Sequence, residues 1–222
     1  MTNIPGKHRW DVSSDEAIAI QRQLRSQVLT TNGITLTTLK TIAGVDAAYR
    51  DKTGEAKAAI VVLTFPELEV VEQVVATRPI SFPYVPGLLS FREAPVVLDA
   101  LSSLRARPDL LMCDGQGYAH PRRLGLASHL GVYLDMPSIG CAKSRLIGSY
   151  AEPGPNKGSV SPLTDHGETI GMVLRSKTGT RPLFISIGHM IDLATAVLLV
   201  NQCLRGYRLP EPTRLADKLS KL

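Results

Sequence analysis

Apolar residues recur with two different periods along the chain, and the changes of period divide it into helices and strands. Ser13 to Glu16 forms a start of the capping-box type, and apolar residues at helical spacing follow it as far as Val28. Three runs typical of strands come next, separated by short turns, at residues 41–49, 57–65 and 68–77. Their short connections predict an antiparallel meander.

The second half alternates helical segments with short apolar runs. A loop rich in proline and glycine covers residues 79–90, and a helix is expected from Glu93 to Arg107. The remaining predicted elements are a buried strand at 109–113, a helix at 125–134, a buried strand at 137–142, an exposed loop at 149–165, a late hairpin of strands at 168–174 and 182–187, a helix at 192–204 and a basic tail at 206–222.

This order predicts an α/β fold in one domain, residues 1–222, with a mixed sheet flanked by helices. The sheet joins the antiparallel meander to parallel strands. The order is similar to the RNase H-like nuclease architecture, although several other folds share it.

Composition narrows the class of protein only slightly. The chain has 222 residues, of which 44% are hydrophobic and 20% charged, as in ordinary globular proteins. A net charge of +5 suits a polyanionic partner, although many unrelated proteins reach it. Residues 1–10 show no leader-like apolar segment, and no apolar run approaches membrane-spanning length. We therefore expect a cytoplasmic monomer with no membrane partner.

Three cysteines, Cys113, Cys141 and Cys203, are widely spaced in apolar surroundings. An odd number with such spacing argues against a disulfide framework and against a zinc site. We interpret them as small core residues in a reducing compartment.

Acidic residues at three positions carry the candidate chemistry. Asp46 interrupts an apolar strand, where an unpaired carboxylate is costly. Asp114 follows the buried strand 109–113, and Glu93 begins the next helix after the proline-rich loop. Carboxylates that converge repel one another unless a cation lies between them, and oxygen ligands favour Mg²⁺ or Mn²⁺. Such an ion could activate water and stabilise the leaving oxygen of a phosphodiester.

Each acid also has an ordinary structural explanation. Glu93 could be a first-turn helix acid, and Asp114, which precedes Gly115, could be a turn residue. Asp46 is the hardest of the three to explain without a site.

Several long segments occur in a fixed order: GVDAAY (44–49), PYVPGLLSFRE (83–93), CDGQGYAHPRRLGLASHLG (113–131) and CAKSRLIG (141–148). The later segments ISIGHMIDL and GYRLPEPTRLAD continue the series. Together they resemble the signature segments of the endonuclease V family, from about Gly44 to the tail. The resemblance implies an RNase H-like nuclease that uses Mg²⁺, for which Mn²⁺ can substitute. It implies incision of DNA at the second phosphodiester on the 3′ side of a deaminated purine, chiefly hypoxanthine, with inosine-containing RNA as a further substrate.

The resemblance also implies a role for individual positions. Asp46, Glu93 and Asp114 match the family's metal-binding acids, and Lys143 and His120 match its active-site lysine and histidine. Tyr84 matches a wedge tyrosine. The positions that match or adjoin the base-binding loops are Pro83, Pro86, Gly87, Leu89, Arg92, Gly115 and Gly125.

The residue types are compatible with these roles. Lys143 could hold the scissile phosphate or the attacking water, although a lone lysine is more often solvated. His120 could position water, or contact a phosphate if protonated, although a loop histidine is commonly a surface residue. Tyr84 stands in a stiff Pro-Tyr-Val-Pro loop and could fill the gap left by a flipped base, although a packed turn has the same composition.

Glycines and arginines surround these positions. Gly87, Gly115 and Gly117 would let the backbone approach a planar base, although glycine-rich loops are usually turns. Phosphate contacts are expected from arginines near the site and in the tail, although a solvated surface is the default for each: Arg92, Arg122, Arg123, Arg145, Arg205, Arg208 and Arg214. His129, His166 and His189 receive no role.

Two other functions remain open from the sequence. A general RNase H-like nuclease or junction resolvase would share the carboxylates but needs no wedge loop or glycine-lined pocket. A non-catalytic lesion-binding module would keep Tyr84 and the basic loops but needs no acid cluster.

Overall fold

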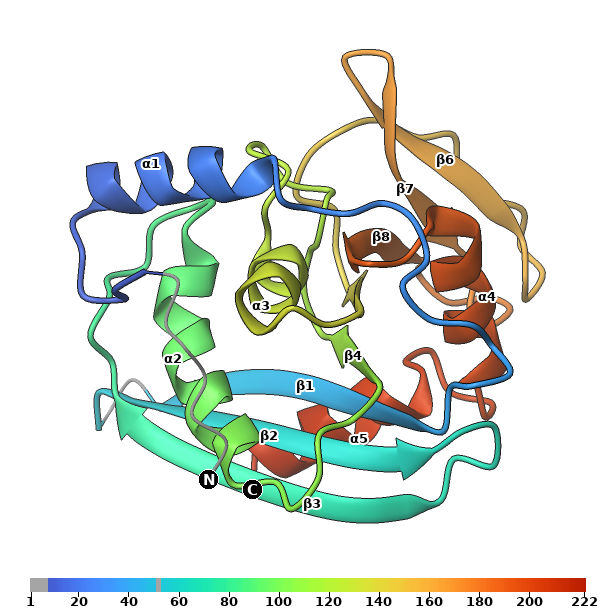
Figure 1. Ribbon diagram of the computed structural model, residues 1–222. Coiled ribbons are helices and arrows are strands. Elements are labelled where there is room, and N and C mark those ends of the chain that lie inside the picture. The colour runs from blue at the N-terminus through green and yellow to red at the C-terminus, as the bar shows by residue number, and fades with distance from the viewer. Residues whose placement is uncertain (1–7, 51–52) are drawn as a thin grey trace.

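The structure is a computed structural model that describes residues 8–50 and 53–222 (Figure 1). Most of the N-terminal segment considered above, and part of the first predicted turn, lie outside the described residues. The strands are β1 Thr41–Arg50, β2 Glu55–Thr64, β3 Val70–Pro79, β4 Leu110–Cys113, β5 Ser138–Ala142, β6 Val160–Asp165, β7 Glu168–Leu174 and β8 Leu183–His189. The helices are α1 Ser14–Arg25, α2 Leu89–Ser102, α3 Leu126–Leu134, α4 Leu193–Gln202 and α5 Glu211–Ser220.

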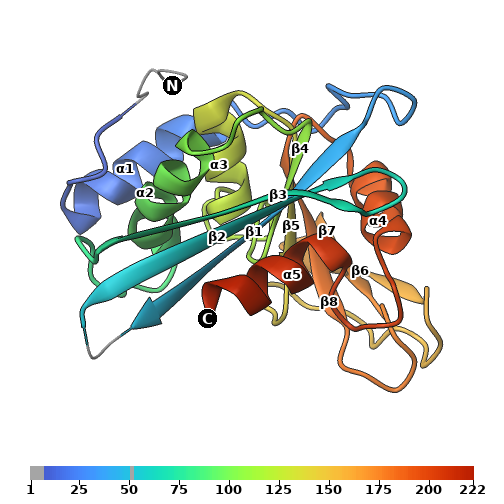
Figure 2. The ribbon, with the colours of Figure 1, turned by 90° about the horizontal axis from the view of Figure 1, so that it is seen from below.

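The strands form one mixed sheet in the order β3-β2-β1-β4-β5-β8-β7-β6. β1, β4 and β5 are mutually parallel, and the other neighbouring pairs are antiparallel. The sheet separates α1, α2 and α3 from α4 and α5 (Figure 2). The predicted fold, an antiparallel meander joined to parallel strands and flanked by helices, is confirmed. No helix in the described part of the chain is long and apolar enough to cross a membrane.

Alternate residues of β1 face the two helical layers. Val45 is buried in one cluster with residues of α2 and α3, whereas Ile42 belongs to a second cluster with Leu199 of α4. Asp46 therefore points to the same side as Ile42 and Gly44. On that side α5 crosses β1 so closely that a Cβ on Gly44 would lie 1.9 Å from the carbonyl oxygen of Pro212. Gly44 thus allows α5 to cover the strand next to Asp46.

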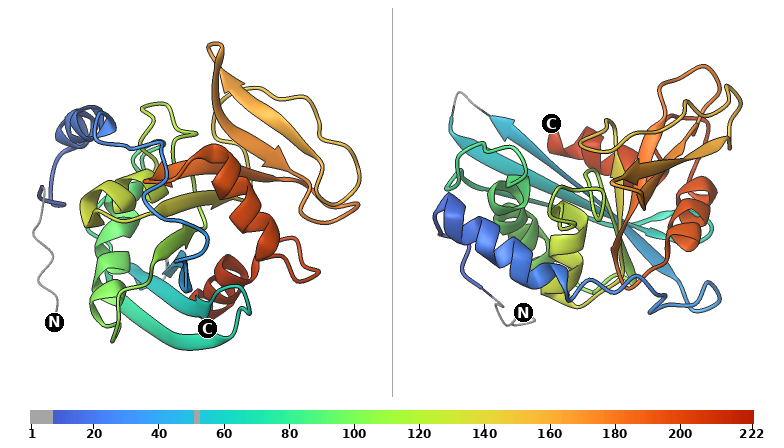
Figure 3. Two further views of the ribbon diagram at one scale, coloured as in Figure 1. Left: turned by 45° about the vertical axis from the view of Figure 1, so that its right-hand side comes forward. Right: turned by 90° about the horizontal axis from the view of Figure 1, so that it is seen from above.

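Three predicted elements were wrong in extent. α2 begins at Leu89, so Glu93 lies in its second turn and does not open it. The predicted exposed loop 149–165 contains β6, which pairs with β7 in a hairpin that projects from the body (Figure 3). The predicted basic tail contains α5, whose face of Thr213, Ala216 and Ser220 is buried. Loop-like composition hid both elements, since prolines lie within β6 and in the first turn of α5.

Candidate active site

Three carboxylates meet at the end of the parallel strands. Asp46 on β1, Asp114 after β4 and Asp217 on α5 each offer an oxygen, and these oxygens all lie within 4.8 Å of one another. The parallel register explains the first two, because Val45 pairs with Cys113 and the next residue of each strand is acidic. The backbone N–H of Asp114 donates to the carbonyl of Val45 at 2.8 Å, which fixes the turn that presents this acid.

Lys143 is the cation of this cluster. It follows β5, which is parallel to β4, so its side chain reaches the same end of the sheet. Its ammonium group forms ion pairs with Asp114 and with Asp217. Burial by itself would lower the pKa of Lys143, but the hydrogen bonds and charges of the two carboxylates outweigh it and hold the pKa above its usual value. Arg208 supports this segment by donating to the Lys143 carbonyl at 2.6 Å.

Asp46 is the most deeply desolvated acid of the three. Its side chain is buried, and the Ser220 hydroxyl donates to Oδ2 at 2.5 Å. Burial raises the pKa of Asp46 to about 7, and the neighbouring charge of Asp114 acts in the same direction. Without a cation, burial therefore favours the protonated form of Asp46 more than in an ordinary aspartate.

Glu93 approaches from the opposite helical layer and does not belong to the set within 4.8 Å. It is buried on α2, and the Tyr49 hydroxyl donates to its Oε1 at 2.9 Å. Burial raises the pKa of Glu93 to about 8, with contributions from the charges of Asp46 and Asp114. Of the three acids proposed from the sequence, the structure brings Asp46 and Asp114 together. Glu93 lies outside this group but close enough for their charges to affect its pKa.

Asp217 is the member that sequence reasoning missed. It lies in what was interpreted as a basic tail, where Lys218 and Lys221 surround it. Burial raises the pKa of Asp217, but hydrogen bonds from Lys143 and Lys221 outweigh this effect and keep the pKa below its usual value. The available signal was the spacing of the small residues Thr213, Ala216 and Ser220, which marks one buried helical face beside Asp217.

These residues fit a hard divalent cation. Their donors are carboxylate oxygens, the ligand type that Mg²⁺ and Mn²⁺ prefer. Asp114 Oδ2 is buried, and its partner is the ammonium group of Lys143, with which it forms an ion pair. Carboxylates this close together repel one another, and a bound divalent cation would relieve that repulsion.

The raised pKa of Asp46 predicts how the stability of the metal-free protein depends on pH. The pKa is about 7 in the folded chain against an ordinary value of 3.8, so the native state binds the extra proton between these pH values. The free energy of unfolding should then fall as pH rises through this window, and this contribution is lost above the folded pKa. Glu93 contributes with the same sign. Urea titrations across the window test this, with Asp46→Asn as the comparison.

The variant should show a weaker decline, because its amide does not ionise. Mg²⁺ should stabilise the wild type more at higher pH, since the ligand oxygens must lose their protons to bind it. An identical pH dependence for both chains would contradict the assigned pKa.

A cavity of about 380 Å³ adjoins the carboxylates. One wall comes from the proline-rich loop and the start of α2, through Tyr84, Val85, Pro86, Gly87, Leu89 and Ser90. Other lining residues come from the loops after β4 and β5 and from the start of α3: Gly115, Gln116, Gly125, Leu126 and Leu146. Asp114, His120 and Lys143 also line it. The positions Tyr84, Pro86, Gly87, Leu89, Gly115 and Gly125, selected from the sequence, thus surround one hollow.

The carbonyl of Gly87 anchors the proline-rich loop. It accepts from Arg122 at 2.6 Å and from the Gln21 amide at 3.1 Å, and His120 Nε2 lies 3.0 Å from it. The Arg122 backbone N–H donates to His120 Nδ1, so the ring proton is on Nε2 and points to Gly87. Burial lowers the pKa of His120 to about 4, and the charge of Arg122 adds to this. His120 is therefore neutral and holds the loop.

Tyr84 projects from the tip of this loop. Its side chain is 71% exposed, and Pro83 and Pro86 beside it are exposed as well. An exposed aromatic ring on a loop that is anchored at Gly87 is a rigid apolar projection beside the cavity.

Many of the arginines selected from the sequence are engaged within the protein. Arg123 is buried and forms ion pairs with Asp165 at 2.8 Å and Glu168 at 2.9 Å. Arg92 stacks on Tyr49 at 4.4 Å and donates to the Phe82 carbonyl. The hydrogen-bond partners of Arg122, Arg205, Arg208 and Arg214 are also protein groups.

Arg145 is exposed and lies between two cavities. It lines the pocket beside Tyr84 and also a larger, open cavity of about 940 Å³ that Arg181 borders. Lys143 and Ser144 line both cavities too. Basic side chains of Lys143, Arg145 and Arg181 therefore line the cavities beside the carboxylates, where they can contact a phosphodiester backbone.

Comparison with known proteins gives a consistent result. The family model described as endonuclease V matches residues 22–218. An endonuclease V of Nostoc punctiforme is 54% identical over 213 residues, which cover 96% of each chain. The crystal structure of the Streptomyces avermitilis endonuclease V superposes with a TM-score of 0.90 and 44% identity, covering 96% of this chain and 93% of the other.

A complex with nucleic acid is among the similar structures. The Ciona intestinalis endonuclease V, solved with a 24mer DNA that contains an inosine followed by a ribo-adenosine, has a TM-score of 0.81 and 29% identity. The alignment covers 93% of this chain and 95% of the Ciona chain.

Proposed function

The chain belongs to the endonuclease V family of nucleases, and from that premise we propose that it is a DNA repair endonuclease specific for deaminated purines, chiefly hypoxanthine. It hydrolyses the second phosphodiester on the 3′ side of the lesion and leaves a 5′-phosphate and a 3′-hydroxyl. One observation carries the proposal: the pocket beside Tyr84 shares Asp114 and Lys143 with the carboxylate cluster. Binding of a base in the pocket would therefore place the backbone of the same strand beside the carboxylates.

The pocket suits a single extruded base. Its volume of about 380 Å³ lies at the small end of ligand pockets, and it is bounded by glycine backbone and by apolar Leu89 and Leu126. Apolar side chains can pack against the faces of a base, and nearby peptide groups can read its edge.

The acids supply the chemistry. Asp46, Asp114 and Asp217 would hold Mg²⁺, with Glu93 behind them, and Mn²⁺ meets the same ligand requirements. The bound ion supplies an activated water and neutralises charge on the leaving oxygen. Ser220 orients Asp46, Tyr49 orients Glu93, and Lys143 presents a positive charge to the phosphate.

The pocket would contact the base and not the sugar, so we extend the proposal to strands of RNA that contain inosine. The basic side chains of Lys143, Arg145 and Arg181 would contact the backbone in both cases. We further propose that residues 1–222 act as one monomeric nuclease unit in the cytoplasm. The three cysteines are free and buried, as expected in a reducing compartment.

The two alternative functions, a general nuclease or resolvase and a non-catalytic binding module, each leave part of the site unexplained. A general RNase H-like nuclease or a junction resolvase has no use for a base-sized pocket beside the acids, and a binding module has no use for the acids. Matched DNA strands with and without one inosine, incubated with Mg²⁺ or with EDTA, separate the three functions. The proposal requires cleavage of the inosine strand in Mg²⁺ only. Equal cutting of both strands would favour the general nuclease, and binding without cutting would favour the module.

Tyr84→Ala is expected to weaken cleavage of duplex substrates more than of single strands. Only a duplex has a gap to fill when its base leaves the stack, and stacking on an aromatic ring contributes roughly 1–3 kcal/mol per base. Cleavage efficiency on matched inosine duplexes and single strands measures the difference, with Tyr207→Ala, another exposed tyrosine, as the control. Equal losses on both substrates would show that Tyr84 is not a wedge.

A further inference from the structure

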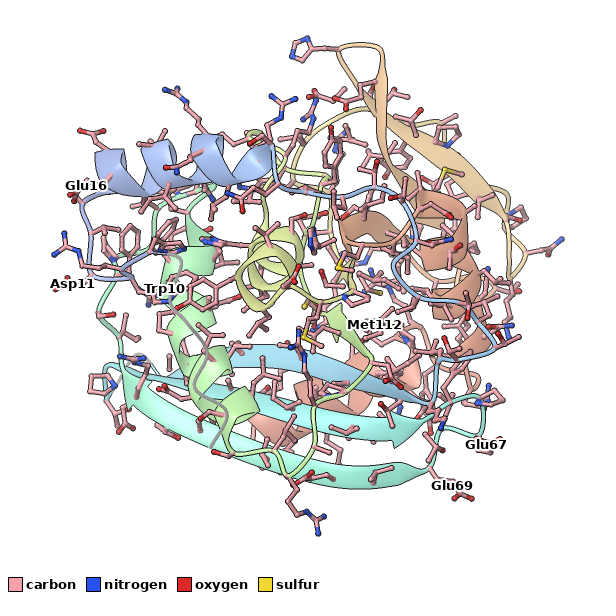
Figure 4. The ribbon with its side chains drawn as sticks, in the orientation of Figure 1. Trp10, Asp11, Glu16, Glu67, Glu69 and Met112 are labelled. Atoms are coloured by element: carbon pink, nitrogen blue, oxygen red, sulfur yellow. The ribbon has the colours of Figure 1, made fainter. Side chains whose placement is uncertain are left out.

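Ser90 lies at depth in the pocket beside Tyr84. It stands in the first turn of α2, lines the pocket and is only 2% exposed. Its hydroxyl oxygen lies 2.9 Å from Nδ1 of His129, a fully buried histidine on α3. His129 belongs to an aromatic cluster with Trp10, which lies against α2 and α3 (Figure 4).

The direction of this hydrogen bond is set by a residue outside the pocket. His8 Nδ1 lies 2.7 Å from the carbonyl oxygen of Arg9. A carbonyl only accepts, so Nδ1 of His8 carries a proton. Burial lowers the pKa of His8, which favours the neutral ring and leaves its Nε2 with a lone pair.

That lone pair determines the tautomer of the next ring. Nε2 of His8 lies 2.8 Å from Nε2 of His129, so His129 must donate there. Burial lowers the pKa of His129 well below its usual value, so its ring is neutral and carries one proton only. Nδ1 of His129 is then an acceptor, and the Ser90 hydroxyl must donate to it.

Ser90 consequently has no hydrogen left for a ligand. A serine hydroxyl has one hydrogen and two lone pairs, and the hydrogen points to His129. We propose that Ser90 is a specificity-determining hydrogen-bond acceptor in the base pocket, which selects bases that carry a ring N–H. The proposal rests on the proposed function, since it names how that pocket chooses its base.

The chemistry of the two bases matches this selection. Hypoxanthine is a lactam and carries a hydrogen on N1, which can donate to an acceptor. Adenine has a lone pair at N1, which would face the lone pairs of Ser90. When two buried acceptors face each other, neither forms a hydrogen bond, although both have lost their contacts with water. The free energy of binding is therefore less favourable for adenine, and adenine is rejected. Ser90 thereby discriminates against the base from which hypoxanthine arises by deamination.

The test compares Ser90→Ala with wild type on single strands that carry inosine, nebularine or adenosine at one position. Nebularine is a purine with a bare N1, so it cannot donate to Ser90. The variant should lose about tenfold in kcat/KM on inosine, the effect of one neutral hydrogen bond, and lose little on nebularine. Its preference for inosine over adenosine should fall. Ser128→Ala, which removes another buried hydroxyl that does not line the pocket, should change neither ratio.

Two further measurements do not depend on the fold of that variant. Two-bond ¹H–¹⁵N spectra of the wild type should show His129 with its proton on Nε2. His8→Phe, remote from the pocket lining, removes the acceptor for that proton and should also lower the preference for inosine over adenosine.

The proposal is overturned if His129 carries its proton on Nδ1, or if Ser90→Ala loses equally on inosine and nebularine. If wild type itself fails to prefer inosine, the proposed function is wrong and this inference falls with it. If wild type prefers inosine but Ser90→Ala leaves the inosine-to-nebularine and inosine-to-adenosine ratios unchanged, the role of Ser90 is wrong and the proposed function stands.

Discussion

Asp46→Asn and Asp114→Asn should each lower cleavage of an inosine strand by about 10³-fold or more, the scale of losing a metal ligand in a hydrolase. Each change removes a negative charge from a set of oxygens within 4.8 Å of one another, which would weaken the binding of a cation. Asp217→Asn should behave in the same way, although the sequence analysis gave this residue no role. Binding of the inosine strand should fall much less, because an amide has nearly the shape of the carboxylate that it replaces and leaves the pocket open to the base.

Single-turnover cleavage rates and strand affinities measure both effects. Asp99→Asn is the matched control, since Asp99 is half exposed and forms an ion pair with Arg78 outside the site. Near-normal turnover of Asp46→Asn or Asp114→Asn would contradict the assignment of the metal ligands.

Lys143→Met should lower cleavage by about 10²–10³-fold, as when a group that stabilises transition-state charge is removed. Its ammonium group contacts Asp114 and Asp217 and lines the pocket, so it lies between the lesion and the acids. Lys143→Arg should restore little, because a planar guanidinium does not occupy the place of a compact ammonium.

Lys221→Met is the matched control for this change. Lys221 also forms an ion pair with Asp217, at 2.7 Å, but its side chain is 62% exposed and it lies at the C-cap of α5. Its loss should change the rate only slightly. If both lysine variants were equally active, Lys143 would be only a surface partner of Asp217.

The sequence was most informative where a polar residue conflicts with its surroundings. Asp46 interrupts an otherwise buried strand, and this conflict alone pointed to a site. Asp114 could be placed beside it because consecutive buried strands in an α/β pattern are commonly parallel. The mixed sheet and the meander followed from apolar periodicity in the same way.

Other parts of the site could not be predicted, because they depend on packing between distant segments. Glu93 and Asp46 approach from opposite faces of the sheet, which only the register of β1 and the docking of α2 reveal. Asp217 reaches the cluster because Gly44 lets α5 lie on β1, a contact between residues far apart in the chain. The position of His120 was predicted, but its bond to Gly87, which makes it an anchor of the loop, was not.

The central claim is that a base held in the pocket places its own strand at the acids. The rigid separation between pocket and carboxylates should then set a fixed distance from lesion to cut. The most direct test uses end-labelled strands in which inosine is moved one position at a time, cut in Mg²⁺ and resolved to single nucleotides. The account predicts a cut that follows the inosine at the second phosphodiester on its 3′ side, with a 5′-phosphate on the product. A cut that stays in place as inosine moves, or an abasic product, would contradict it.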